Sequence, residues 1–112
     1  MNLEITPEVI ASQLEIGKTE ASLRQIETNI ENTKNFDAFS KHIISLNDKL
    51  KHMHAYVGLS NKESYFKIKC DNLDSEEIIK EFLNEVDHWS NKYHVELRQL
   101  ENKNIFYIIG KN

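Results

Sequence analysis

Histidine is the residue type in this chain best suited to bind a metal ion or to move a proton near neutral pH. His52 and His54 lie two residues apart in an expected helix, His42 lies further back, and His88 and His94 follow later. Residues two apart on a helix point about 200° away from each other, so His52 and His54 cannot share one ion. None of the five has the Cys, His or Asp spacing of a zinc site. The sequence therefore predicts no metal ligand.

Cysteine and glycine give catalysis no further support. Cys70 is the single cysteine, and it falls on the apolar side of the alternating segment SYFKIKC, where a thiol packs as a small core residue. The three glycines are isolated, so the sequence contains no glycine-rich loop for a phosphate group. We therefore expect no catalytic residue, no cofactor, and a protein that is not an enzyme.

Aromatic and basic side chains alternate on one face of the expected strands. Tyr65, Lys67 and Lys69 share the polar side of one strand, and Arg98 faces Tyr107 in the expected final hairpin. Such a face could stack bases and hold phosphates, as single-strand RNA-binding sheets do. The formal net charge of −4 and the missing RNP-type motif weigh against nucleic acid as a partner. Single-stranded RNA binding is therefore the alternative hypothesis.

The elements that position these residues follow from the apolar pattern, which is clearest between residues 36 and 58. The apolar residues recur there at alternating spacings of three and four, which predicts a helix that buries one narrow seam. Gly58 can adopt a left-handed conformation and is expected to end this helix. The seam consists of Phe36, Phe39, Ile43, Leu46, Leu50, Met53 and Val57.

A first helix is expected from the segment TPEV, where Thr6 caps the helix and Pro7 takes its first position. Gly17 is expected inside this helix as a tolerated interruption. Its apolar residues form two stripes on nearly opposite sides, so the helix needs two partners. The main stripe contains Ile5, Val9, Ile16, Leu23, Ile26 and Ile30, and the second stripe contains Ile10, Leu14 and Ala21.

These two helices are expected to form an antiparallel hairpin. The segment ENTKN between them breaks the heptad register, and Asn35 is a suitable cap for a helix that begins at Phe36. One continuous helix of about fifty residues, paired in a parallel coiled-coil dimer, is the alternative.

The remaining chain is expected to form a β-α-β-β unit. The segments SYFKIKC, VELRQL and IFYII predict three strands, and Asp74 with Glu77 marks the capped start of the intervening helix. IFYII is apolar on both faces, which is typical of a central strand. The last strand is therefore placed between the other two in a three-stranded antiparallel sheet, a split β-α-β arrangement.

The predicted fold class is α+β, with a coiled-coil-like helical hairpin over residues 1–58 and the β-α-β-β unit over residues 59–112. The two parts are expected to form one compact structural unit. In this arrangement the second stripe of the first helix and the second face of the sheet have no partner. A small sheet offers too little surface to cover both. We therefore expect a homodimer.

The predicted function is a non-catalytic protein–protein interaction module, such as a small acidic adaptor, regulator or chaperone-like protein. No segment reaches the roughly 18 apolar residues of a membrane span and none resembles a signal peptide, so a cytoplasmic protein without a membrane partner is expected. The expected interface with a second copy, or with another protein, consists of Ile10, Leu14, Ala21, Phe36, Phe39, Ile43, Leu46, Leu50 and Met53.

Overall fold

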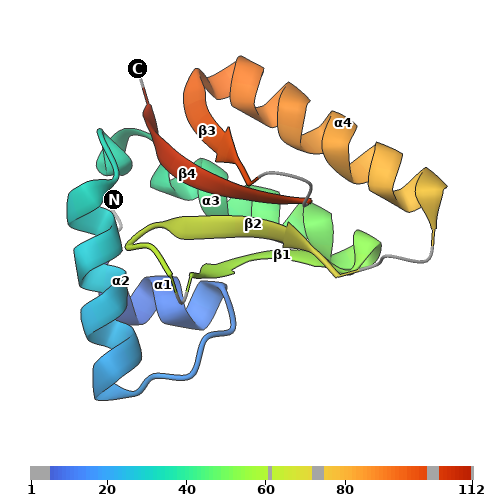
Figure 1. Cartoon of the computed structure of the whole chain (residues 1–112). Helices are drawn as coiled ribbons and strands as arrows, with labels where there is room; N and C mark the ends of the chain where they lie inside the picture. The colour runs from blue at the N-terminus through green and yellow to red at the C-terminus, as the bar shows by residue number, and fades with distance from the viewer. Residues whose placement is uncertain (1–5, 61, 72–74, 101–103, 112) are drawn as a thin grey trace.

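The computed structural model describes residues 6–60, 62–71, 75–100 and 104–111. Over these residues the chain forms four α-helices and one antiparallel sheet of four strands, which confirms the α+β class (Figure 1). The helices are α1 (Pro7–Gln13), α2 (Glu20–Asn32), α3 (Phe36–Leu50), which continues into the short 3-10 helix η1 (Lys51–Met53), and α4 (Glu76–Tyr93). The strands are β1 (Ala55–Leu59), β2 (Phe66–Cys70), β3 (Val95–Gln99) and β4 (Ile105–Lys111).

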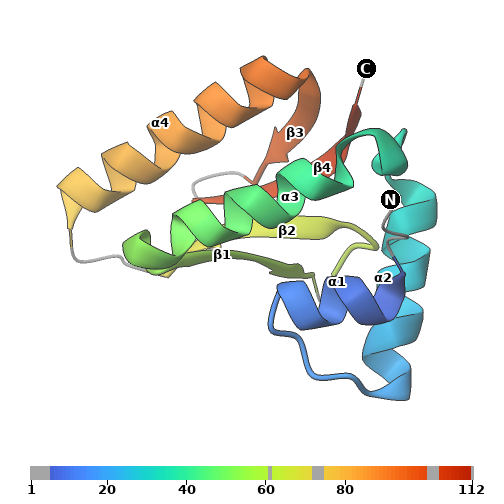
Figure 2. The same cartoon turned by 180° about the vertical axis from the view of Figure 1, so that it is seen from behind.

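The sheet has the order β1-β2-β4-β3, and α3 and α4 lie side by side across one of its faces (Figures 1 and 2). We call this covered face the inner face and the opposite one the outer face. As its two apolar faces predicted, β4 lies between β2 and β3. The predicted hairpin register is also confirmed, since Arg98 stands opposite Tyr107.

The expected three-stranded sheet is wrong by one strand, because residues 55–59, which the apolar spacing assigns to the end of a helix, form β1. The helical segment ends at Met53, His54 adopts a left-handed backbone with φ of 56°, and the chain then pairs with β2. Val57 keeps the helical spacing, but it enters the core from a strand, opposite Ile68. Gly58 accordingly lies inside β1, and the division expected after residue 58 falls within this strand.

The single first helix that was expected is two helices. Thr6 caps α1 as predicted, because its Oγ1 accepts a hydrogen bond from the Val9 N–H at 3.2 Å. The chain then leaves the helix, with φ of 58° at Glu15. Thr19 starts α2 through a capping box in which it and Ser22 each accept a hydrogen bond from the other's backbone N–H at 3.0 Å. This second start signal outweighs the continuous apolar stripe.

The expected antiparallel hairpin of the first two helical segments is also wrong. A turn at residues 33–35 separates α2 from α3, which excludes one continuous helix, but α2 runs crosswise to α3 at one end of the sheet (Figures 1 and 2). Lys34 in this turn pairs with Gly110 of β4. Asn35 precedes α3 as predicted, but its Nδ2 donates to the Lys111 carbonyl at 2.8 Å instead of its side chain capping the helix. These bonds tie the turn to the sheet.

The start of α4 differs slightly from the predicted start. Ser75 is the capping residue, and its Oγ accepts from the Ile78 N–H at 3.3 Å. The predicted cap, Asp74, lies outside the described residues. Within the described part of the chain, no helix has the length and apolar character needed to cross a membrane.

Candidate functional site

The seam of α3 is buried inside one chain. The ring of Phe36 stacks on Phe66 of β2 with centroids 5.7 Å apart, and Phe39 lies 6.4 Å from the ring of Trp89 on α4. The seam therefore packs against the inner sheet face and α4. Of the residues expected at an interface, Ala21 is exposed on α2, whereas the following are at most 6% exposed: Ile10, Leu14, Phe36, Phe39, Ile43, Leu46, Leu50 and Met53.

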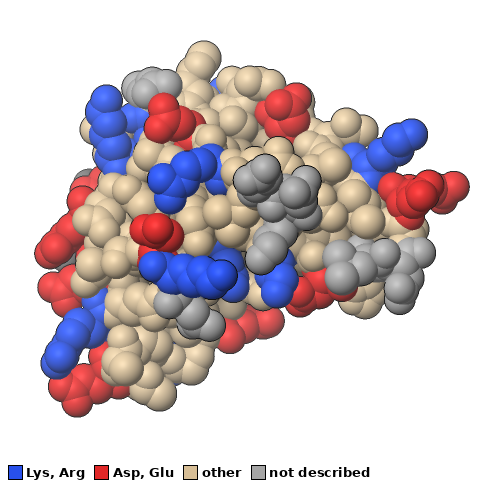
Figure 3. Space-filling model, viewed as in Figure 1, with Lys and Arg blue, Asp and Glu red and all other residues tan. Residues whose placement is uncertain are grey.

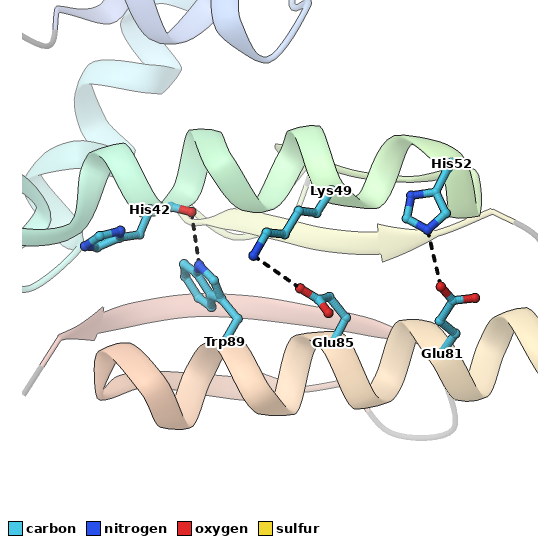
Figure 4. Close-up of polar contacts among 6 residues, drawn as sticks. All are labelled: His42, Lys49, His52, Glu81, Glu85 and Trp89. Atoms are coloured by element: carbon cyan, nitrogen blue, oxygen red, sulfur yellow. Dashed lines mark hydrogen bonds and ion pairs between the residues drawn. The ribbon is translucent and has the colours of Figure 1, made fainter.

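Polar contacts join α3 and its extension η1 to α4 (Figure 4). Residue numbers rise along α3 where they fall along α4, so the antiparallel helix pair of this protein is α3 with α4. The contacts are Trp89 Nε1 donating to the His42 carbonyl at 3.0 Å, Lys49 with Glu85 at 3.8 Å, and His52 with Glu81 at 3.3 Å.

His42, His52, His54 and His94 form part of this scaffold, whereas His88 is exposed on α4. The His42 ring stacks on Tyr93 with centroids 3.7 Å apart, and burial, followed by the positive charges of Lys92 and Lys111, lowers the pKa of His42 below its ordinary value. His54 and His94 take left-handed conformations at the ends of η1 and α4. Among the described residues, no group of three or more His, Cys, Asp or Glu side chains could hold a metal ion.

The structure brings the predicted aromatic and basic residues together on the outer face. Tyr107 is only 3% exposed, because Tyr65 packs 6.1 Å from its ring and the guanidinium of Arg98 lies 5.3 Å above it. The Tyr107 hydroxyl also shares a hydrogen bond of 3.1 Å with the Ser60 hydroxyl. Tyr107 therefore has no free ring face on which a base could stack.

The two lysines of this face are half-buried. Burial, followed by the neighbouring positive charge of Lys69, lowers the pKa of Lys67, while Lys69 pairs with Asp71 at 3.5 Å. Figure 3 shows this side of the molecule, where basic groups alternate with acidic ones. The outer face therefore has local positive charge without forming a continuous basic surface.

The two edges of the sheet differ in how their backbone groups are satisfied. At the β1 edge, the Val57 N–H donates to Asn47 Oδ1 at 2.9 Å, so a side chain of α3 takes the place of a further strand. Asn47 is 2% exposed, and its Nδ2 reaches the Gln13 carbonyl at the end of α1 at 3.5 Å. The central N–H of the β1 edge is therefore already satisfied.

At the β3 edge, the pairing with β4 determines which backbone groups point away from the sheet. The Leu100 N–H donates to the Ile105 carbonyl at 2.9 Å, and Arg98 stands opposite Tyr107 in the same register. Backbone groups alternate in direction along an antiparallel strand, so those of Arg98 face β4 and those of Leu97 face outward. The register with β4 shifts between Glu96 and Leu97, and in the described part of the chain no hydrogen bond from outside the sheet ladder engages the N–H or carbonyl of Leu97.

A shallow groove of about 500 Å³ runs beside this edge, between α4 and the inner face of β3. Leu83, Leu97 and Phe106 are partly buried apolar residues that expose the rest of their surface here. A strand placed along β3 would bond to Leu97 and direct alternate side chains toward the groove. The full lining is Leu83, Val86, Asp87, Ser90, Leu97, Gln99 and Phe106.

Sequence reasoning did not single out this groove. The alternating segment VELRQL and the central position expected for the last strand did predict an edge strand in this place. The groove itself depends on where α4 crosses the sheet, which no local pattern encodes. Comparison of the chain with protein-family models, curated proteins and solved structures found no match. Function is therefore argued from this geometry.

Proposed function

We propose that this chain is a non-catalytic protein-interaction module that accepts an extended strand of a protein partner along β3. The observation that carries the proposal is the outward N–H and carbonyl of Leu97 beside an apolar groove. An unpaired sheet edge is a template for a further strand, whose main-chain hydrogen bonds give affinity and whose side chains give specificity. In this role the chain acts as an adaptor, regulator or chaperone-like protein.

The contrast between the two edges supports the choice of β3. At the β1 edge, the buried Asn47 already satisfies the central N–H, that of Val57. At β3, Ser90 Oγ donates to the Val95 carbonyl at 2.7 Å, but the groups of Leu97 are left for another chain. The mixed lining of the groove, with Asp87 and Ser90 at its polar side, suits a partner strand that is apolar on one face.

Site-specific photo-crosslinking in the cells of origin tests the proposal. A benzophenone amino acid replaces Asp87, which lines the groove and is exposed, and in a matched control it replaces Glu8, which is exposed on α1. We expect a discrete protein adduct at position 87 and none at position 8. The Leu97→Pro variant should lose this adduct, because proline removes the outward N–H without breaking the ladder to β4.

The Leu97→Pro comparison is valid only for a folded variant, which far-ultraviolet circular dichroism establishes. If it does not fold, Leu97→Lys provides the comparison, since a lysine at an edge discourages strand addition. Equal adducts at positions 87 and 8, or no adduct at position 87, would contradict the proposal.

Single-stranded RNA binding by the outer face is the second candidate function. Its support is the gathering of Lys67 and Lys69 beside Arg98 and Tyr65, although the buried ring of Tyr107 removes one stacking surface. The test is fluorescence polarisation of a short oligouridylate at low salt. Binding that disappears in the Lys67→Glu/Lys69→Glu variant would support this candidate, and absence of binding by the unaltered protein would eliminate it.

A further inference from the structure

We infer that the strand accepted along β3 is β3 of a second copy of this chain, paired antiparallel about a two-fold axis at Leu97. The inference rests on the proposed function and names its partner. In this arrangement each Leu97 N–H donates to the carbonyl of the partner's Leu97, so both outward groups of this residue are satisfied at once. The two sheets then join into one continuous sheet.

The charges on β3 determine the register of this pairing. With Leu97 on the axis, Glu96 stands opposite the partner's Arg98, and Arg98 stands opposite the partner's Glu96. A shift of the axis to residue 96 would instead place two glutamates directly opposite each other, and a shift to residue 98 would oppose two arginines. Opposite charges at facing positions stabilise an antiparallel pair, whereas like charges destabilise it. The short sequence Glu-Leu-Arg is thus complementary to itself.

Both charged groups are available for this role. Glu96 and Arg98 are exposed, and neither forms an ion pair within the described part of the chain. The Arg98 guanidinium is already positioned over the rings of Tyr107 at 5.3 Å and Tyr65 at 5.9 Å. Because this side chain is ordered before association, less conformational entropy is lost when the partner arrives.

The apolar side of the junction is complementary as well. Residues alternate between the two faces of a strand, so Leu97 points to the inner face when Glu96 and Arg98 point to the outer face. The two copies of Leu97 would meet where the two grooves join, and each would cover apolar surface of Leu83 and Phe106. Polar pairs and apolar contacts are therefore satisfied in the same register.

Light scattering behind a sizing column, repeated over a wide dilution range, measures the association. We expect twice the chain mass of 13.2 kDa at high concentration and a concentration-dependent return to the monomer. The single variants Glu96→Arg and Arg98→Glu should each weaken dimerisation by about tenfold or more, because two attractive pairs become repulsive. The double variant Glu96→Arg/Arg98→Glu should restore it, because the pairs are attractive again with their signs exchanged.

This rescue separates association from folding. The Arg98→Glu variant and the double variant both lose the contacts between Arg98 and the tyrosines. Recovery of dimerisation in the double variant is therefore explained only by pairing between two copies. Residue-resolved hydrogen exchange supplies a second readout. The Leu97 amide should become protected as the concentration rises, whereas an exposed loop amide such as that of Lys18 should not.

Three outcomes would overturn the inference. They are a monomer at every concentration, a dimer whose stability is indifferent to both charge reversals, and a Leu97 amide that stays unprotected in the dimer. A monomer that still gives a position-87 adduct with a different protein would leave the proposed function intact and remove the second copy as its partner. Absence of any adduct would instead remove the proposed function itself.

Discussion

At the scale of single residues, Gly110 occupies the most constrained position among the three glycines. Its φ is 155°, and a Cβ built on it would lie 2.5 Å from the Cβ of Lys34 and 2.7 Å from the Lys34 backbone nitrogen. Glycine is required here because the turn before α3 is bonded directly to β4 at this point.

We therefore predict that Gly110→Ala lowers the free energy of unfolding by more than about 2 kcal/mol. Gly17→Ala is the matched control, since nothing lies within 4 Å of the Cβ that it would add. That substitution should change stability by less than about 1 kcal/mol. Urea denaturation of both variants provides the measurement, and equal effects would show that the contact with Lys34 does not constrain the fold.

Two buried asparagines differ in their hydrogen bonding. Neither side-chain polar atom of Asn29 finds a partner among the described residues, whereas Asn47 accepts from the Val57 N–H. We predict that Asn29→Leu raises the free energy of unfolding by about 1 kcal/mol, because an unsatisfied buried amide is removed. Asn47→Leu should lower it by about 1–3 kcal/mol, because the Val57 N–H loses its acceptor. Comparable losses in both variants would contradict this assignment.

The lowered pKa of His42 predicts a dependence of stability on pH. The folded protein binds this proton more weakly than the unfolded chain, whose histidine titrates near 6.5. The free energy of unfolding should therefore fall as the pH drops below 6.5, and this loss should level off below the folded pKa. His42 stacks on Tyr93 and lies near the positive charges of Lys92 and Lys111.

The contribution of His42 is isolated by comparison with His42→Gln, measured by urea denaturation between about pH 5 and pH 8. The variant should lose less stability than the unaltered protein as the pH falls. Parallel pH profiles would show that another group is responsible.

At the scale of elements, the sequence predicted those whose signals are local. The capping residue Thr6 predicted the start of α1, and the alternation of SYFKIKC predicted β2. The two apolar faces of IFYII predicted the central position of β4. It did not predict β1, because a strand of five residues that follows a helix without a break in apolar spacing has no local signature. The left-handed turn at His54, which ends the helical segment, is stabilised by the pairing that follows it.

The seam was predicted as an element but assigned the wrong neighbours. Leu50 is fully buried, so Leu50→Ala should cost about 2–5 kcal/mol through lost contacts and a residual cavity. Ile44 on the same helix is only partly buried, and Ile44→Ala should cost distinctly less. Thermal or urea unfolding of the two variants tests the assignment. A similar cost at both positions would argue against a buried seam on the inner sheet face.

At the scale of the whole molecule, the sheet draws its strands from both sides of the division expected after residue 58. Residues 59–112 alone would lack α3 and nearly all of β1, so Phe66 would lose its stacking partner Phe36 and Ile68 would lose its strand neighbour Val57. We predict that this fragment does not fold in isolation, since a small sheet needs a packed face for stability. A well-dispersed amide spectrum from the fragment would refute the prediction.

The candidate site was accessible to sequence reasoning only in part. The edge position of VELRQL followed from the central place given to the last strand, and the pairing of Arg98 with Tyr107 was correct. The Tyr107 hydroxyl is bonded to Ser60, which lies 47 residues away in the chain, and the groove depends on the path of α4. Contacts at such separations are set by tertiary packing.

If two copies pair through β3 as proposed, the β1 edge determines whether the assembly can grow further. A sheet with two open edges can add copies indefinitely and grow into a fibre, whereas a sheet with one open edge is used up by a single addition. In a pair formed through β3, the two β1 edges would lie on the outside, and the central Val57 N–H of each is already bonded to Asn47. The same buried amide that satisfies the Val57 N–H would thus disfavour the addition of a further strand at the outer edges of the pair.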